Sequence, residues 1–139
     1  MKPHLHRIRV YWEDTDAGGI VYHSNYLNFA ERARTEMVRD LGVKQSDLAA
    51  QGFAFAVRRA GVDFFKSARL DDHLEVESVA TALGGASLDI IQTIRRLDDG
   101  ANLVRLDVKL AFIRLDGRPA RIPAELKASL QAYVNEERR

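Results

Sequence analysis

The chain has 139 residues and no cysteine, which predicts one domain over residues 1–139 and excludes disulfide bonds, thiolate metal sites and a cysteine nucleophile. Its 21 lysines and arginines are interleaved with 20 aspartates and glutamates, and no basic cluster indicates a nucleic-acid partner. Since no segment approaches the roughly 18 apolar residues of a membrane span, and the start of the chain lacks the apolar core of a signal peptide, we expect a cytoplasmic protein.

The first predicted element is a β-strand from Arg7 to Trp12, because charged and apolar residues alternate along it. Further on, apolar residues recur at three- or four-residue spacing, which predicts a long helix from about Ser24 to Leu41. Ser24 is a suitable N-cap, and Gly42 stands where a C′ glycine ends a helix.

Beyond a short helical turn at residues 46–51, the chain is strand-like until its last quarter. Residues 53–57 and 62–65 predict one long strand interrupted near Gly61, and residues 74–77 and 88–97 predict two more. Short turn sequences separate these strands, and Pro123 begins a short amphipathic helix that carries Leu126, Leu130 and Val134. The clearest alternation places five apolar residues on one face of a strand: Val104, Leu106, Val108, Leu110 and Phe112.

Consecutive strands joined by hairpin-length turns pair antiparallel, so the order of elements predicts an α+β fold. We expect an antiparallel sheet of about five strands around one apolar helix. A chain of this length leaves an edge or a face of such a sheet uncovered, which favours self-association.

The loop from Glu13 to His23 concentrates the residues capable of chemistry. It holds three carboxylates, and the adjacent Gly18 and Gly19 let the backbone approach a ligand closely. It ends where the predicted helix begins, and the first amides of a helix are unpaired donors suited to an anion or a developing oxyanion. We expect Asp16 to reach whatever those amides hold.

Other interpretations of this loop stay open at this point. Aspartate and glycine are common turn formers between a strand and a helix, and His23 is suited to a structural bond at the helix end. The pair Asp14 and Asp16 resembles the metal-binding loop of aspartate-nucleophile phosphatases, but Gly18 replaces the final Thr or Val of that loop. The predicted sheet also lacks the parallel strands of those enzymes.

The other histidines and the aromatic residues give weaker signals. We expect His4, His6 and His73 to be surface residues, the first two beside a frayed terminus. Nucleophile-elbow and phosphate-loop motifs are absent from the sequence. Four phenylalanines are able to line an acyl pocket, although core packing is the more common role of this residue type: Phe53, Phe55, Phe64 and Phe65.

The segment Val10–Tyr26, together with Glu31–Arg34, resembles the tol-pal-associated acyl-CoA thioesterase family of the YbgC type. That family lies in the 4-hydroxybenzoyl-CoA thioesterase group of the hotdog fold. Ala68–Asp72 and Ser87–Leu88 continue the likeness, so it extends over nearly the whole chain.

This resemblance implies a hotdog fold, in which an antiparallel five-stranded sheet wraps round a long central helix and subunits pair as homodimers or homotetramers. It implies that Asp16 is catalytic, as nucleophile or as general base toward water, and that the backbone amide of His23 is the oxyanion donor. The His23 side chain would orient Asp16 or the water, or protonate the leaving thiolate.

The implied substrate is a small acyl-CoA with a short aliphatic or aryl acyl group, and an acyl carrier protein is a further partner that the family allows. The resemblance implies no cofactor and no metal. For the CoA phosphates, the sequence offers Arg58, Arg59, Lys66 and Arg69 without deciding among them. A non-catalytic acyl-CoA or acyl-carrier-protein binding module is the alternative, because hotdog folds also host such roles.

Overall fold

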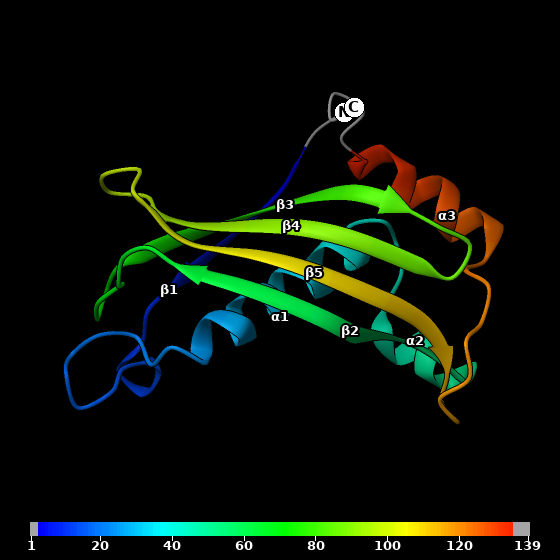
Figure 1. Ribbon diagram of the computed structural model, residues 1–139, viewed down its shortest axis with the longest axis horizontal. Helices are drawn as coiled ribbons and strands as arrows, with labels where there is room; N and C mark the ends of the chain where they lie inside the picture. The colour runs from blue at the N-terminus through cyan, green and yellow to red at the C-terminus, as the bar shows by residue number, and fades with distance from the viewer. Residues whose placement is uncertain (1–2, 135–139) are drawn as a thin grey trace.

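The computed structural model describes residues 3–134, which form one antiparallel sheet with helices against it (Figure 1). The sheet has five strands in the order β1-β3-β4-β5-β2. The strands are β1 (His4–Arg9), β2 (Phe53–Phe64), β3 (His73–Leu83), β4 (Ser87–Arg96) and β5 (Asn102–Arg114). The helices are α1 (Asn25–Arg39), α2 (Gln45–Ala50) and α3 (Ala124–Leu130), and two 3₁₀ turns cover Trp12–Asp14 and Gln131–Tyr133.

The predicted α+β class and antiparallel five-stranded sheet are confirmed, and the strand sequences account for both. β3, β4 and β5 follow one another through short turns, whereas β2 pairs with β5 at one edge and β1 with β3 at the other. β2 is one continuous strand of 12 residues, as expected. Its irregularity lies between Val57 and Arg59, not at Gly61.

The core lies between α1 and the face of the sheet that the β5 alternation predicts. All five alternating residues of β5 are buried, with Val104, Leu106 and Phe112 fully inaccessible. Against them α1 buries Phe29 and Met37, and small residues between these allow the helix backbone to approach the sheet closely.

α1 ends as its sequence predicts but begins differently. Gly42 adopts φ +87°, and its N–H donates to the carbonyl of Arg39 over 2.8 Å, which is the expected helix stop. Ser24 precedes the first helical residue, but its side chain makes no capping hydrogen bond. The helix has 15 residues and is shorter than the expected span from Ser24 to Leu41.

The N-terminal region differs most from expectation. β1 is displaced toward the N-terminus, so the chain leaves the sheet at Arg9 and Trp12 is 78% exposed in a 3₁₀ turn. The expectation that His4 lies on the surface is wrong. It is 6% exposed, and its Nε2 lies 2.7 Å from Oδ2 of Asp40 at the end of α1. His6 and His73 are half-buried strand residues, so the same expectation fails for them too.

Within residues 3–134, each helix is too short or too polar to cross a bilayer.

Candidate active site

The loop before α1 reverses direction tightly and returns beside itself. The N–H of Asp16 donates to the carbonyl of Ile20 over 2.9 Å, and the N–H of Gly19 donates to the carbonyl of Asp16 over 3.1 Å. Thr15 and Val21 pair across the base of this reversal. Gly19 adopts φ +80°, a conformation that side chains other than glycine rarely take, so this turn needs a glycine there.

The carboxylate of Asp16 is oriented by the same turn. Its Oδ1 accepts a hydrogen bond from the N–H of Gly18 over 2.8 Å. Oδ2 has no protein donor among the described residues, and the Asp16 side chain is exposed. One carboxylate oxygen is therefore fixed, and the other is available to a ligand or a water molecule.

Asp14, by contrast, has a structural role in this loop. It is 9% exposed, and its Oδ2 accepts the N–H of Tyr11 over 2.9 Å. Its carbonyl accepts the N–H of Tyr22 and the side-chain amide of Asn25, both over 2.9 Å. Because the Asp14 carboxylate is engaged locally, it does not form a metal-binding pair with Asp16. Residues 3–134 contain no cluster of three potential metal ligands.

The start of α1 presents free backbone donors. The N–H groups of Asn25 and Tyr26 already donate to the carbonyls of Tyr22 and His23. Those of His23 and Ser24 donate to no acceptor within residues 3–134. They lie at the positive end of a 15-residue helix dipole, so they are suited to a negatively charged oxygen.

Asp16 and His23 line one pocket of about 240 Å³ beside this helix end. The His23 ring meets the edge of Phe64 from β2, with ring centres 6.3 Å apart. The remaining lining comes from the loop, from α1 and from the chain after β2: Ile20, Val21, Tyr26, Phe65, Lys66 and Ser67. The structure thus brings together the two residues that the sequence singled out.

Some residues of this pocket could not be identified from their own sequence context. Tyr26 is buried, and its hydroxyl oxygen accepts the N–H of Ala68 over 2.9 Å. Burial raises the pKa of the Tyr26 hydroxyl, so it stays protonated at neutral pH, although the Ala68 hydrogen bond acts in the opposite direction. Ser67 also lines the pocket, but the sequence around a single serine after a strand does not predict that it belongs to a binding site.

The four cationic residues that the sequence suggested for phosphate binding lie at different places in the fold, and one of them lines the Asp16 pocket. Lys66 lines the pocket of Asp16 and His23. Arg59 lines a different pocket, over β3, β4 and β5, and Arg58 lies in the exposed middle of β2. Arg69, three residues after Lys66, is exposed.

One protein-family model matches most of the chain, including the loop before α1. The model of the thioesterase-like superfamily matches residues 10–130 of the chain. This chain belongs to that superfamily. It is 42% identical over 124 residues to the acyl-CoA thioesterase YbgC of Haemophilus influenzae, a match that covers 88% of this chain and 90% of that protein.

Two further comparisons agree. The acyl-CoA thioester hydrolase YbgC of Escherichia coli is 39% identical over 127 residues, covering 89% of this chain and 92% of that protein. The crystal structure of a probable thioesterase from Bartonella henselae matches with a TM-score of 0.82 and 36% identity, covering 87% of this chain and 99% of that one. The resemblance to the YbgC type is confirmed, and the chain is a thioesterase of this superfamily.

This thioesterase has a second, larger cavity of about 490 Å³ between α1, α2 and β2. Apolar side chains from the helix and the sheet line it together with Arg34 and Glu31. A smaller pocket that shares Arg34, Glu31 and Val57 extends it along α1 to Leu27, in the first turn of the helix. Of the four phenylalanines named from the sequence, Phe55 lines the larger cavity, whereas Phe53 stacks on Phe112 in the core.

Proposed function

We propose that this protein hydrolyses the thioester of a small acyl-CoA, in the cytoplasm, to a free acid and CoA. The observation that carries the proposal is the shared pocket of the Asp16 carboxylate and the helix end at His23, where free N–H groups and a free carboxylate oxygen occur together. A thioester carbonyl needs both an oxyanion donor and a nucleophile or base, and these are the groups that supply them.

In the proposed reaction the thioester oxygen accepts a hydrogen bond from the His23 N–H. One such donor lowers a barrier by about 3 kcal/mol when it is aligned with the developing oxyanion. Asp16 then acts in one of two ways. As a nucleophile it attacks the carbonyl carbon and expels the CoA thiolate, giving a mixed anhydride that water hydrolyses. As a general base it takes a proton from the water that attacks the same carbon.

The His23 side chain contributes less than Asp16 in this scheme. Its ring packs against Phe64, and it lines the same pocket as Asp16. It is available to orient the attacking water or to protonate the departing sulfur. Because a thiolate is already a good leaving group, the second role adds little to the rate.

We propose Lys66 as a contact for a CoA phosphate, since it is the cation that lines this pocket among the described residues. The acyl group would extend along α1 toward the larger cavity, whose lining combines apolar side chains with Arg34 and Glu31. A short aliphatic or an aryl acyl group suits that space. No separate cofactor takes part in this scheme, and an acyl carrier protein would present its thioester to the same pocket.

We further propose that residues 1–139 form a single hotdog domain that pairs with a second copy through β2. This strand stands at the edge of the sheet, and Val57 and Phe64 within it, like Phe65 directly after it, are each at least half exposed. An edge strand with exposed apolar side chains is a template for pairing. Pairing there would continue the sheet and bring a second α1 toward the open side of the larger cavity. The product is a homodimer that is able to assemble further to a homotetramer.

A thiol-release assay over a panel of acyl-CoAs tests the function. We expect wild type to release CoA and Asp16→Asn to lose at least about 100-fold in kcat, because the amide neither attacks nor takes a proton. His23→Ala should lose less than Asp16→Asn. Glu13→Gln is the matched control, since Glu13 is an exposed carboxylate of the same loop that lines a different pocket.

The outcomes separate the two candidate functions. Equal turnover by Asp16→Asn and wild type would remove Asp16 from the mechanism. Saturable acyl-CoA binding without turnover of any acyl-CoA or acyl carrier protein thioester would instead favour the non-catalytic binding module.

A further inference from the structure

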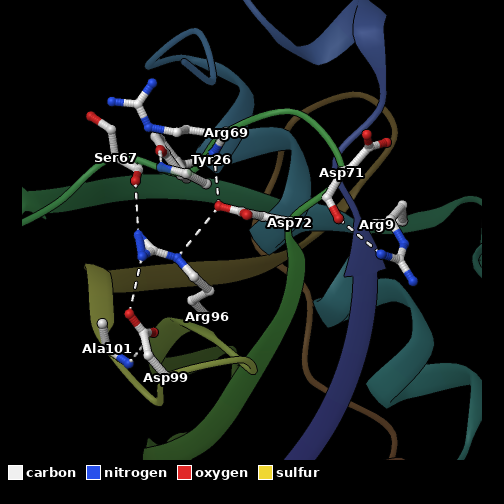
Figure 2. A network of polar contacts seen from close by, with 10 residues as sticks. Arg9, Tyr26, Ser67, Arg69, Asp71, Asp72, Arg96, Asp99 and Ala101 are labelled. Atoms are coloured by element: carbon white, nitrogen blue, oxygen red, sulfur yellow. Dashed lines mark hydrogen bonds and ion pairs between the residues drawn. The ribbon is translucent and has the colours of Figure 1, made fainter. Parts of the chain in front are cut away.

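One peptide group beside the pocket is held at both of its ends. The carbonyl oxygen of Ser67 accepts a hydrogen bond from Nη2 of Arg96 over 3.1 Å. The N–H of Ala68, which belongs to the same planar peptide group, donates to the hydroxyl oxygen of Tyr26 over 2.9 Å. Figure 2 shows Arg96 reaching from β4 to Ser67, with Tyr26 beside the same stretch of chain. A side chain from β4 and one from the first turn of α1 thus fix the plane of this peptide between them.

Arg96 is itself fixed by two carboxylates. Its Nε lies 3.4 Å from Oδ2 of Asp72, and its Nη1 lies 3.2 Å from Oδ2 of Asp99 (Figure 2). The same Asp72 oxygen accepts the N–H of Arg69 over 2.9 Å. Oδ1 of Asp99 accepts the N–H of Ala101 over 3.0 Å, so both carboxylates are anchored. Asp72 contributes an ion pair without a hydrogen bond to Nε, and the guanidinium held between the two carboxylates directs Nη2 at the Ser67 carbonyl.

The clamped peptide is connected to the loop that carries the proposed oxyanion donor. The carbonyl of Ala68 accepts the N–H of Val21 over 2.9 Å, and Arg69 forms a bridge with Ile20. Val21 lies two residues before His23. Ala68 is fully buried and closely packed, so a displacement of this peptide also displaces the loop residues that are hydrogen-bonded to it.

The neighbouring arginine shows that this arrangement is specific. Arg95 is also half-buried and ion-paired, but it bonds Glu75 and Glu77 on β3. It touches neither the chain after β2 nor the loop before α1 in the hydrogen bonds and ion pairs of the described residues. Two adjacent arginines of one strand therefore have separate sets of partners.

We propose that Arg96 is a positioning residue for the thioesterase site, acting through the Ser67–Ala68 peptide on the loop that ends at His23. Through this peptide it holds Ser67 against the pocket and keeps the helix end in register with Asp16. The inference rests on the proposed function of Asp16 and the His23 amide, and it adds a residue outside the pocket on which their alignment depends.

The test compares Arg96→Gln, Arg96→Lys and Arg95→Gln in the full-length protein. A displacement of catalytic groups by about 1 Å costs on the order of 100-fold in rate, and a smaller shift costs less. We therefore expect kcat to fall about tenfold in Arg96→Gln. KM for the acyl-CoA should change less than about threefold. Arg96→Lys retains the charge between the two aspartates and should recover part of that loss. Arg95→Gln should keep kcat within about twofold of wild type.

A structural measurement separates failure of this inference from failure of the proposed function. Amide hydrogen exchange should quicken at Ala68 and Val21 in Arg96→Gln but not in Arg95→Gln, whether or not a substrate is known. Unchanged exchange at both amides in a folded Arg96→Gln would overturn the inference. So would a wild-type kcat in Arg96→Gln when Asp16→Asn is inactive, because the site then works without the clamp.

Discussion

Oδ1 of Asp16 accepts the backbone N–H of Gly18 at 2.8 Å, so the carboxylate is aimed by a residue only two positions further along its own loop. This bond leaves the other oxygen without a partner among the described residues, and Asp16 lines the same pocket as His23. The same contact leaves little space at Gly18. A Cβ atom added there would lie 3.2 Å from Oδ1, closer than nearly all real Cβ contacts.

Gly18→Ala should therefore reduce activity more than stability. The carboxylate must move by a few tenths of an ångström to admit the methyl group, and the loop is exposed, so the fold is little affected. We expect kcat to fall roughly three- to tenfold and the melting temperature to change by less than about 3 °C. Steady-state thiol release and thermal unfolding measure the two quantities.

Gly85→Ala is the matched control for that substitution. Gly85 stands in the turn between β3 and β4, and an added Cβ there meets only a side-chain nitrogen of Arg121 at an ordinary 4.0 Å. It should keep the kcat of wild type. Full activity in Gly18→Ala would show that the precise direction of the Asp16 carboxylate is unimportant for the reaction.

Gln92 links α1 to the sheet by hydrogen bonds, and we expect these bonds to contribute strongly to the free energy of unfolding. It is fully buried, and its Nε2 donates to the carbonyl of Ala30 and to Oγ of Ser78, both over 3.0 Å. Its Oε1 accepts Nη1 of Arg34 over 2.9 Å. Burial lowers the pKa of Arg34, although Glu31 raises it, so a lost partner costs this guanidinium more than it would in water.

Gln92→Met keeps the volume but leaves these groups without their partner. We expect a loss of about 3 kcal/mol in the free energy of unfolding, measured by urea denaturation. Adding Arg34→Met to Gln92→Met should cost little more, because the unpaired guanidinium is then removed as well. A loss below about 1 kcal/mol for Gln92→Met would mean that Arg34 and Ser78 find other partners.

The fold was predictable where a residue's role is local. The alternation in β5 identified the buried face because α1 covers only one face of the sheet, and Gly42 marked the end of α1 through its own backbone. His4 was misjudged because its partner, Asp40, lies 36 residues away, and position near a terminus suggested exposure. The long-range contact overrides the local expectation.

The candidate site divides in the same way. Asp16, Gly18 and His23 are close in sequence, and their types carry the chemistry, so the loop alone pointed to them. Tyr26 and Ser67 join the pocket only because the chain after β2 returns to the start of α1. Arg96 reaches that chain from a third element, and its pairing with Asp72 and Asp99 is invisible until the strands are in register.

The β2 edge predicts where a second copy binds. Val57 on β2 and Leu5 on β1 are similarly exposed, at 50% and 51%, on opposite edges of the sheet. Val57→Lys should therefore weaken dimerisation at least about tenfold, whereas Leu5→Lys should leave it unchanged. Sedimentation over a concentration series measures both. A monomeric wild type at micromolar concentration, or dissociation by Leu5→Lys alone, would contradict pairing through β2.

His6 should make the stability of the protein depend on pH. Burial lowers its pKa below 6.5 and outweighs Glu36 and Asp40, which raise it, while His4 and Arg32 lower it further. A histidine with a lowered pKa in the folded state stays neutral there while the unfolded chain takes up a proton. The folded state is therefore favoured above pH 6.5 and loses stability as the pH falls through 6.5 toward the folded-state pKa.

His6→Gln should remove that part of the acid sensitivity, because glutamine keeps a polar side chain on β1 that does not titrate. The free energy of unfolding, measured by urea denaturation from pH 8 to pH 5, should fall less steeply in His6→Gln than in wild type. His73→Gln, at a half-buried position at the start of β3, is the control for replacing a strand histidine by glutamine. A slope in His6→Gln equal to that of wild type would assign the acid sensitivity to a group other than His6.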